Sequence, residues 1–148
     1  MIRFYLKKKP DLNLESIKDL KSICRKFTAL IIQRECKSLK EVSFIFCSDK
    51  YIRKVNKQFL GHDYETDIIT FHDSDESGNI ESDIIISVET VAFNAERYKT
   101  EQFNELLRVM IHGILHLCGY DDKKADDRKI MKRKELFYLK KAIACRKK

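Results

Sequence analysis

Two histidines four residues apart in the C-terminal half of the chain are the strongest candidates for chemistry. His112 and His116 lie in the stretch HGILHLCGYDD, residues 112–122. On a helix this spacing projects both imidazoles from one face, so that both can bind a single metal ion. Gly119 is predicted to reverse the chain, which can return Asp122 toward the same ion. Two nitrogens and one carboxylate oxygen leave a position open for water, as in a catalytic zinc site.

The histidine pair also has a purely structural interpretation. Two histidines on an apolar helix can be packed, hydrogen-bonded neutral residues, and the glycine and carboxylate that follow them are what favour a metal site. His62 and His72 are weaker candidates, more typical of a surface or substrate-side residue than of a ligand. His72 would be the substitute ligand if Asp122 pointed away.

The sequence offers several candidates for the group that moves a proton. Zinc proteases place a Glu directly after the first histidine as general base, but here that residue is Gly113, which argues against a protease. The base would then be the metal-bound hydroxide or a nearby carboxylate, for which Asp67, Asp121 and Asp122 are the candidates. An iron oxygenase uses the same ligand types, but the sequence has no cosubstrate motif to support it.

Arg108 lies one turn before His112 on the same row of the predicted helix. It could approach an anionic substrate near the metal, and on that basis we count it among the catalytic candidates. It could equally pair with Glu105 or another acid.

The charge of the chain is unevenly distributed. The net charge is +7, and residues 123–148 hold 12 Lys or Arg against 3 Asp or Glu, so the rest of the chain is slightly acidic. A basic segment of this kind is typical of a polyanion-binding surface, and equally of a solvated helix face.

Length and composition favour one cytoplasmic domain spanning residues 1–148. No apolar run approaches the length of a membrane span, and the N-terminal residues turn to charge too early for a secretory signal. The five cysteines are an odd number without a C-x-x-C pair, which argues against a disulfide framework or a cysteine-rich zinc site.

The pattern of apolar residues predicts an α/β (α+β) fold with a single small mixed sheet of about four strands, covered by about five helices. Strands are expected at 2–6, 42–47, 67–72 and 83–88, the last two as a hairpin. Helices are expected after a cap at Asn13 and Ser16, at 49–59, from Ser87 or Thr90 to Tyr98, from a cap at Thr100 to Cys118, and at 125–143. The metal site would lie on the helix of the C-terminal half that ends before Gly119.

Three blocks of this sequence resemble the YbeY-type endoribonucleases, also described as rRNA maturation factors. HGILHLCGYDD matches the hallmark H-G-x-L-H-L-x-G-Y-D-H at all but its last position. NKQFLGHDYETDIITF, residues 56–71, is similar to N-x-x-[YF]-R-x-x-D-x-x-T-[DN]-V-L-S-F, and SDIIIS, residues 82–87, is similar to G-D-I-x-I-S. The resemblance extends from about residue 42 to 122.

The resemblance implies a small α/β fold with one Zn²⁺ or a related divalent ion per chain, bound by His112, His116 and Asp122. It also implies cleavage of single-stranded RNA in 16S rRNA 3′-end maturation and ribosome quality control. The expected partners are the 16S rRNA precursor, the ribosome or its small subunit, and a ribosomal protein, and no membrane. The RNA would then lie along the basic C-terminal helix.

Two departures from the family pattern affect the prediction. Asp122 replaces the third histidine, which makes the site harder and more anionic and leaves the metal open. Leu60 replaces an arginine expected to face the RNA, for which Arg53, Lys57 or Arg108 could compensate. Leu60 favours the alternative, a non-catalytic RNA- or ribosome-binding assembly factor with a structural metal. A site closed by a fourth protein ligand such as His72 would support that alternative.

Overall fold

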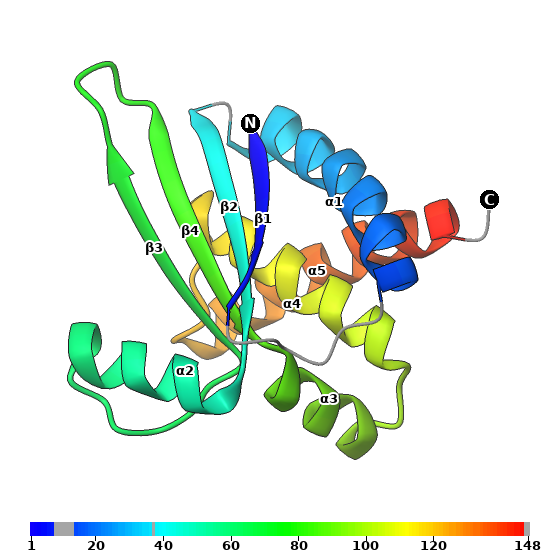
Figure 1. Ribbon diagram of the computed structural model, residues 1–148. Helices are drawn as coiled ribbons and strands as arrows, with labels where there is room; N and C mark the ends of the chain where they lie inside the picture. Colours follow the sequence, from blue (N-terminus) through cyan, green and yellow to red (C-terminus); the bar gives the residue numbers. More distant parts are fainter. Residues whose placement is uncertain (8–13, 37, 147–148) are drawn as a thin grey trace.

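The protein is built on one four-stranded mixed sheet (Figure 1). The computed structural model describes residues 1–7, 14–36 and 38–146. The strand order is β1-β2-β4-β3, in which β2 is parallel to both β1 and β4, and β3 is antiparallel to β4. The strands are β1 (Ile2–Leu6), β2 (Leu39–Cys47), β3 (Ile68–Ser74) and β4 (Ile80–Ser87).

Five α-helices complete the fold, which confirms the predicted class. They are α1 (Leu14–Glu35), α2 (Asp49–Val55), α3 (Val88–Arg97), α4 (Gln102–Leu117) and α5 (Ala125–Arg146), and α2 continues into a short π-helix, η1 (Asn56–Leu60). The side chains predicted to cap α1, on Asn13 and Ser16, lie outside the described part of the chain. None of the helices described is long and apolar enough to cross a membrane.

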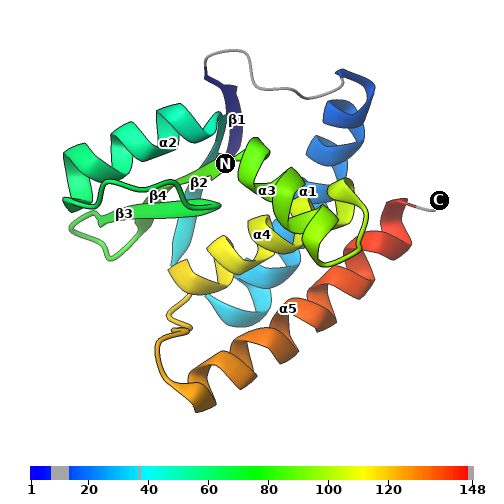
Figure 2. The ribbon, with the colours of Figure 1, turned by 90° about the horizontal axis from the view of Figure 1, so that it is seen from below.

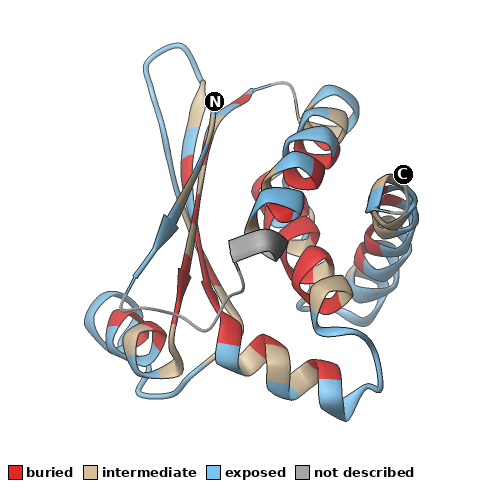
Figure 3. Cartoon of the chain, turned by 45° about the vertical axis from the view of Figure 1, so that its right-hand side comes forward, coloured by how far each residue is buried: buried red, intermediate tan, exposed pale blue. Residues whose placement is uncertain are grey.

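The two faces of the sheet are covered unequally. Figure 2 shows α2 on one side of the sheet and α4 and α5 on the other. The larger core lies on the α4 side, where alternate residues of β2 and β4 such as Phe44 and Ile84 are completely buried. On the other face, Ile52 and Val55 of α2 pack against Ile85 in a smaller cluster. Figure 3 shows buried residues between the layers and exposed residues on the outer surfaces.

Helix α4 is the most deeply buried element, and its partly accessible residues form a single row. From Glu105 to Leu117 every residue is buried except Arg108, His112 and His116. These three are spaced by four residues, so they lie one above the other on one face of the helix. The sequence motif therefore places its polar groups along one narrow strip of an otherwise apolar helix.

Gly113 allows α4 to lie directly on the sheet. A Cβ atom at this position would lie 2.8 Å from Ile68 Cδ1 and 3.1 Å from Ile84 Cγ2, which is closer than ordinary van der Waals contact. A larger side chain would force the side chains of Ile68 and Ile84 to shift. The glutamate that zinc proteases carry at this position would therefore disturb the packing of α4 on the sheet.

At the end of α4 the chain reverses its direction at Gly119, as the sequence predicts. Gly119 has φ +103, a conformation that favours glycine. The Tyr120 N–H donates to the Leu115 carbonyl at 3.1 Å, which closes the helix in a Schellman-type arrangement. This reversal carries Asp121 and Asp122 back toward the exposed row of α4.

Several expected element boundaries were wrong, among them those of β4, which runs from Ile80 to Ser87 instead of 83–88, and of α5, which ends at Arg146 instead of 143. The N-cap of α4 is Glu101 rather than Thr100, because the Thr100 N–H donates to the Ala95 carbonyl and closes the preceding turn. Strand β2 begins at Leu39, earlier than predicted, because Leu39 is buried and pairs with Ile80 of β4.

A carboxylate at the end of α1 binds three groups that are far away in the sequence. Glu35 accepts hydrogen bonds from Tyr120 Oη at 2.5 Å, Tyr138 Oη at 2.6 Å and Lys134 Nζ at 2.9 Å. Burial alone would raise the pKa of Glu35, but these donors outweigh it and lower the pKa to about 2. Glu35 therefore fastens α1 to α5 and to the turn after α4.

Replacing Glu35 by Gln should destabilise the fold in a pH-dependent way. Because the folded pKa is depressed, the stabilisation by the charged carboxylate is present above the unfolded pKa of about 4.3 and lost as the pH falls toward about 2. We expect Glu35→Gln to lower the free energy of unfolding by about 1–3 kcal/mol at neutral pH. Urea denaturation at several pH values should show this difference shrinking as the pH falls.

The exposed Glu96→Gln on α3 is the matched control and should change stability little at any pH. A Glu35→Gln deficit of the same size at neutral and acidic pH would contradict the role assigned to the charged carboxylate.

Candidate metal centre

The two motif histidines face a common hollow. Their rings are parallel to within 3°, with centroids 6.5 Å apart. The hollow has a volume of about 260 Å³. It is lined by α4, by the turn after α4 and by the beginning of β3, through Thr66, Asp67, Ile68, Thr70, His112, His116 and Asp122. We call this hollow the recess.

The hydrogen bonds of the two rings fix which nitrogen faces the recess. His116 Nδ1 lies 3.1 Å from the Tyr120 carbonyl oxygen, which can only accept, so Nδ1 carries the proton. His112 Nδ1 lies 2.7 Å from Glu135 Oε2, and the carboxylate likewise favours a proton on Nδ1. In a neutral imidazole the other nitrogen, Nε2, then has a free lone pair. Each ring therefore has an unprotonated Nε2 that can bind a metal ion.

The turn after α4 adds carboxylates to the two nitrogens. His112 Nε2 lies 3.4 Å from Asp122 Oδ2, whose side chain is 45% exposed. Ligand atoms of His116, Asp121 and Asp122 all lie within 4.8 Å of one another. Asp121 accepts the Asp122 N–H at 2.7 Å, and this backbone hydrogen bond lowers its pKa. The structure therefore brings the three predicted ligands together, with Asp121 beside them at the surface.

The predicted catalytic Arg108 is held by two acids. Its guanidinium donates to both carboxylate oxygens of Glu105, at 2.6 and 3.1 Å, and to Glu135 Oε1 at 2.9 Å. Arg108 is not among the residues that line the recess. Of the two roles that the sequence left open, the geometry supports pairing with acids, which makes Arg108 a positioning residue for Glu135.

Glu135 is the functional candidate that sequence reasoning missed. Its side chain is 8% exposed and bridges Arg108 and His112. Burial raises its pKa, but the hydrogen bonds and charges of His112 and Arg108 outweigh burial and lower it. Burial lowers the pKa of His112, but the hydrogen bond and charge of Glu135, together with the charge of Asp122, outweigh burial and the charge of Arg108 and raise it. The feature of the sequence that could have pointed to Glu135 is that it is one of few acids in a strongly basic helix.

Asp67 lies on the β3 side of the recess, as a predicted proton-transfer group should. Burial raises the pKa of its carboxyl, and the nearby charges of Arg108 and His112 only partly oppose this. A carboxyl with a raised pKa exchanges protons closer to neutral pH than an exposed aspartate does. Asp67 is therefore chemically suited to accept or return a proton in the recess.

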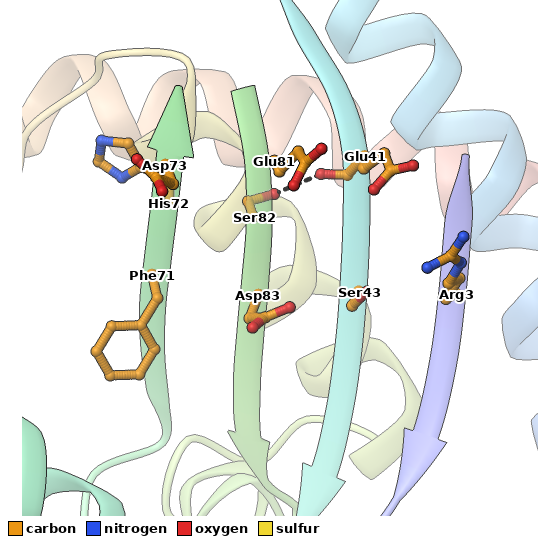
Figure 4. A pocket seen from close by; sticks show the side chains of 9 residues that line it. All are labelled: Arg3, Glu41, Ser43, Phe71, His72, Asp73, Glu81, Ser82 and Asp83. Atoms are coloured by element: carbon orange, nitrogen blue, oxygen red, sulfur yellow. Dashed lines mark hydrogen bonds between the residues drawn. The ribbon is translucent and has the colours of Figure 1, made fainter. Parts of the chain in front are cut away.

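His72 does not line the recess. It borders a separate hollow across the polar part of the sheet, together with Arg3, Glu41 and Asp83 (Figure 4). Among the described residues, the recess contains no further histidine or cysteine beyond His112 and His116. The arrangement thus offers two nitrogens and the Asp122 carboxylate around a hollow, with Asp121 beside them at the surface.

The chain matches a known protein family over most of its length. A family model described as Endoribonuclease YbeY matches residues 6–143. The chain belongs to the YbeY family.

Relatives support this assignment over most of the chain. Endoribonuclease YbeY of Bacteroides fragilis (strain ATCC 25285) is 50% identical over 111 residues, 75% of this chain and 76% of the relative. Endoribonuclease YbeY of Karelsulcia muelleri is 42% identical over 123 residues, 81% of this chain and 86% of the relative. The solution structure of the Thermotoga maritima protein TM1509 superposes with a TM-score of 0.67 at 30% identity, covering 96% of this chain and 89% of that one.

Replacing Glu135 by Gln should weaken metal binding without removing a ligand. The amide cannot supply the negative charge that holds a proton on His112 Nδ1 and raises the basicity of Nε2. Loss of such a partner typically lowers metal affinity by about 10- to 100-fold. Competition of the purified protein with a chromophoric zinc chelator would measure this change.

The control is Asp126→Asn in the exposed first turn of the same helix, which should leave zinc affinity unchanged. Equal zinc affinity of Glu135→Gln and the unsubstituted protein would rule out the orienting role.

Proposed function

We propose that this protein is a metal-dependent endoribonuclease that cleaves single-stranded RNA. The observation that carries the proposal is the pair of Nε2 atoms fixed toward one recess beside Asp122, with room left for water. Membership in a family whose relatives are named Endoribonuclease YbeY supplies the substrate class. On this proposal residues 1–148 act as one catalytic domain.

The ligand set fits a Zn²⁺ ion held by His112, His116 and Asp122, one per chain. Imidazole nitrogens and a carboxylate are common zinc ligands, and three protein ligands with an open position define a catalytic site. A carboxylate in the third position also suits harder divalent ions such as Mn²⁺. Elemental analysis of the purified protein decides between them.

The residues around the recess can carry out hydrolysis of a phosphodiester. An ion of this kind supplies a hydroxide near neutral pH and polarises a phosphoryl oxygen. Asp67 can take the proton of the attacking water and return it to the leaving oxygen. Thr66 and Thr70 line the same side and offer hydroxyl donors to the phosphate. Arg108 and Glu135 hold His112 in place throughout.

We extend the proposal to a cellular role. The substrate would be the 16S rRNA precursor, which would be processed at its 3′ end in the cytoplasm. Processing would take place on the ribosome or its small subunit, with a ribosomal protein as a further partner. The same activity would serve ribosome quality control. The rRNA maturation role attributed to this family motivates these assignments. Cleavage of precursor rRNA within purified small subunits tests them.

A non-catalytic assembly factor is the second candidate. Leu60, at the position of the family arginine, favours it because it is an exposed apolar side chain where a cation would contact RNA. Metal binding and RNA binding by the unsubstituted protein, without cleavage, would support this candidate over the nuclease.

His116→Ala should abolish cleavage of a single-stranded RNA while the fold remains intact, because His116 is exposed and its loss removes a proposed ligand. Cleavage should also stop on addition of a chelator and return with Zn²⁺. Gel analysis of a labelled RNA measures cleavage, and thermal unfolding checks the fold.

His72→Ala is the matched control, since this histidine is exposed and outside the recess, and it should cleave normally. Undiminished cleavage by metal-free His116→Ala would refute the assignment of the site.

A further inference from the structure

Helix α2 presents a row of positive charges on its exposed side. Lys50, Arg53 and Lys54 of α2 follow the spacing i, i+3 and i+4, which places them on one face of the helix, and Lys57 of η1 borders the same hollow. All four are exposed, and together they border a hollow of about 330 Å³. We call these four residues the cation row.

The described residues neutralise the cation row only in part. Among the described residues, Asp63 is the carboxylate within ion-pair distance, 2.9 Å from Arg53 Nε and 4.0 Å from Lys57 Nζ. No described carboxylate pairs with Lys50 or Lys54. Like charges three and four residues apart destabilise a helix, so the row is disfavoured unless an external anion neutralises it.

Two aromatic rings lie on the loop that follows the cation row. The rings of His62 and Tyr64 are 5.4 Å apart, and Tyr64 is 53% exposed. The buried Asn56 holds this loop in place, because its side chain donates to the Tyr64 carbonyl at 3.0 Å and its own carbonyl accepts the His62 N–H at 3.2 Å. The ion pair between Arg53 and Asp63 is a third contact that holds this loop against α2.

The same loop leads directly into the recess. Thr66 and Asp67, which line the recess, follow Tyr64 in the chain. Figure 2 shows the loop running from the end of α2 to β3, the edge strand of the sheet. From α2 toward β3, the chain therefore passes first the cation row, then the two aromatic rings, and then the recess.

We propose that α2 and the loop 62–64 form the binding track for the RNA strand next to the cleaved bond. The cation row binds backbone phosphates, and His62 and Tyr64 stack on bases. A charged groove combined with aromatic platforms is how proteins bind single-stranded nucleic acid without reading its sequence. The track rests on the proposed function, and it supplies the positive charge that Leu60 does not.

Helix α5 carries more cations than α2, and in both regions some of the cations are already paired with acids. Lys134 and Arg146 are engaged by Glu35 and Glu101, at 2.9 and 2.5 Å. The apolar Ile130 and Leu136 are exposed on the same helix. The expectation that RNA lies along α5 is replaced, in this proposal, by binding along α2.

The salt dependence of RNA affinity tests the cation row. The protein carries His116→Ala to prevent cleavage, and the probe is a fluorescein-labelled oligouridylate of about 12 nucleotides. Fluorescence anisotropy gives Kd from about 50 to about 200 mM KCl. Adding Lys50→Ala and Lys54→Ala should weaken binding by about tenfold or more and reduce the slope of log Kd against log salt by about 1.4, since each phosphate contact on a single strand contributes about 0.7.

Two comparisons make the test specific. The control Lys18→Ala with Lys26→Ala removes two exposed lysines of α1 and should preserve both affinity and slope. Tyr64→Ala should weaken binding by about fivefold or more without changing the slope, because stacking is not ionic. An unchanged slope in the α2 double variant, or an equal loss in the α1 control, would overturn the proposal.

The outcome is distinguishable from failure of the nuclease assignment. Cleavage by the unsubstituted protein together with an unchanged slope refutes the track and leaves the nuclease in place. A reduced slope without any cleavage establishes the track and refutes the nuclease.

Discussion

The close packing of α4 on the sheet is the constraint on which the site depends. Gly113 lets the backbone of α4 approach β3 and β4. The apolar residues of α4 are buried around almost the whole circumference of the helix. Such a helix cannot rotate without exposing its core residues to water. His112 and His116 therefore project at a fixed angle toward the beginning of β3, and Asp67, the residue before that strand, lines the same recess.

Buried acids behind α4 explain how the His112 ring is oriented, whereas the Tyr120 carbonyl orients His116. Glu105 and Glu135 would be strongly destabilising if left unpaired in the interior. Arg108 compensates for both, and His112 completes the pairing of Glu135. The guanidinium is thus needed to keep these carboxylates charged, which is why it is not available to a substrate.

The fold class and the proximity of His112, His116 and Asp122 could be predicted from sequence because both rest on local spacing. The periods of the strands and helices, the four-residue separation of His112 and His116 and the glycine reversal are all short-range signals. Glu135 and Glu35 could not be found in this way, since each acts on a partner that only the fold brings near. Of the cation row, the sequence singled out only Arg53 and Lys57, because the four cations are interrupted by buried residues and the basic C-terminal segment dominates the charge of the chain.

The geometry of a bound ion tests the account most directly. Zinc K-edge X-ray absorption and a crystal structure of the zinc-loaded protein would give the ligands and their distances. The account predicts Nε2 of His112 and of His116 at about 2.0–2.1 Å, one Asp122 oxygen at about 2.0–2.2 Å and a water in the remaining position. Coordination through Nδ1, or a fourth protein ligand that closes the site, would contradict it.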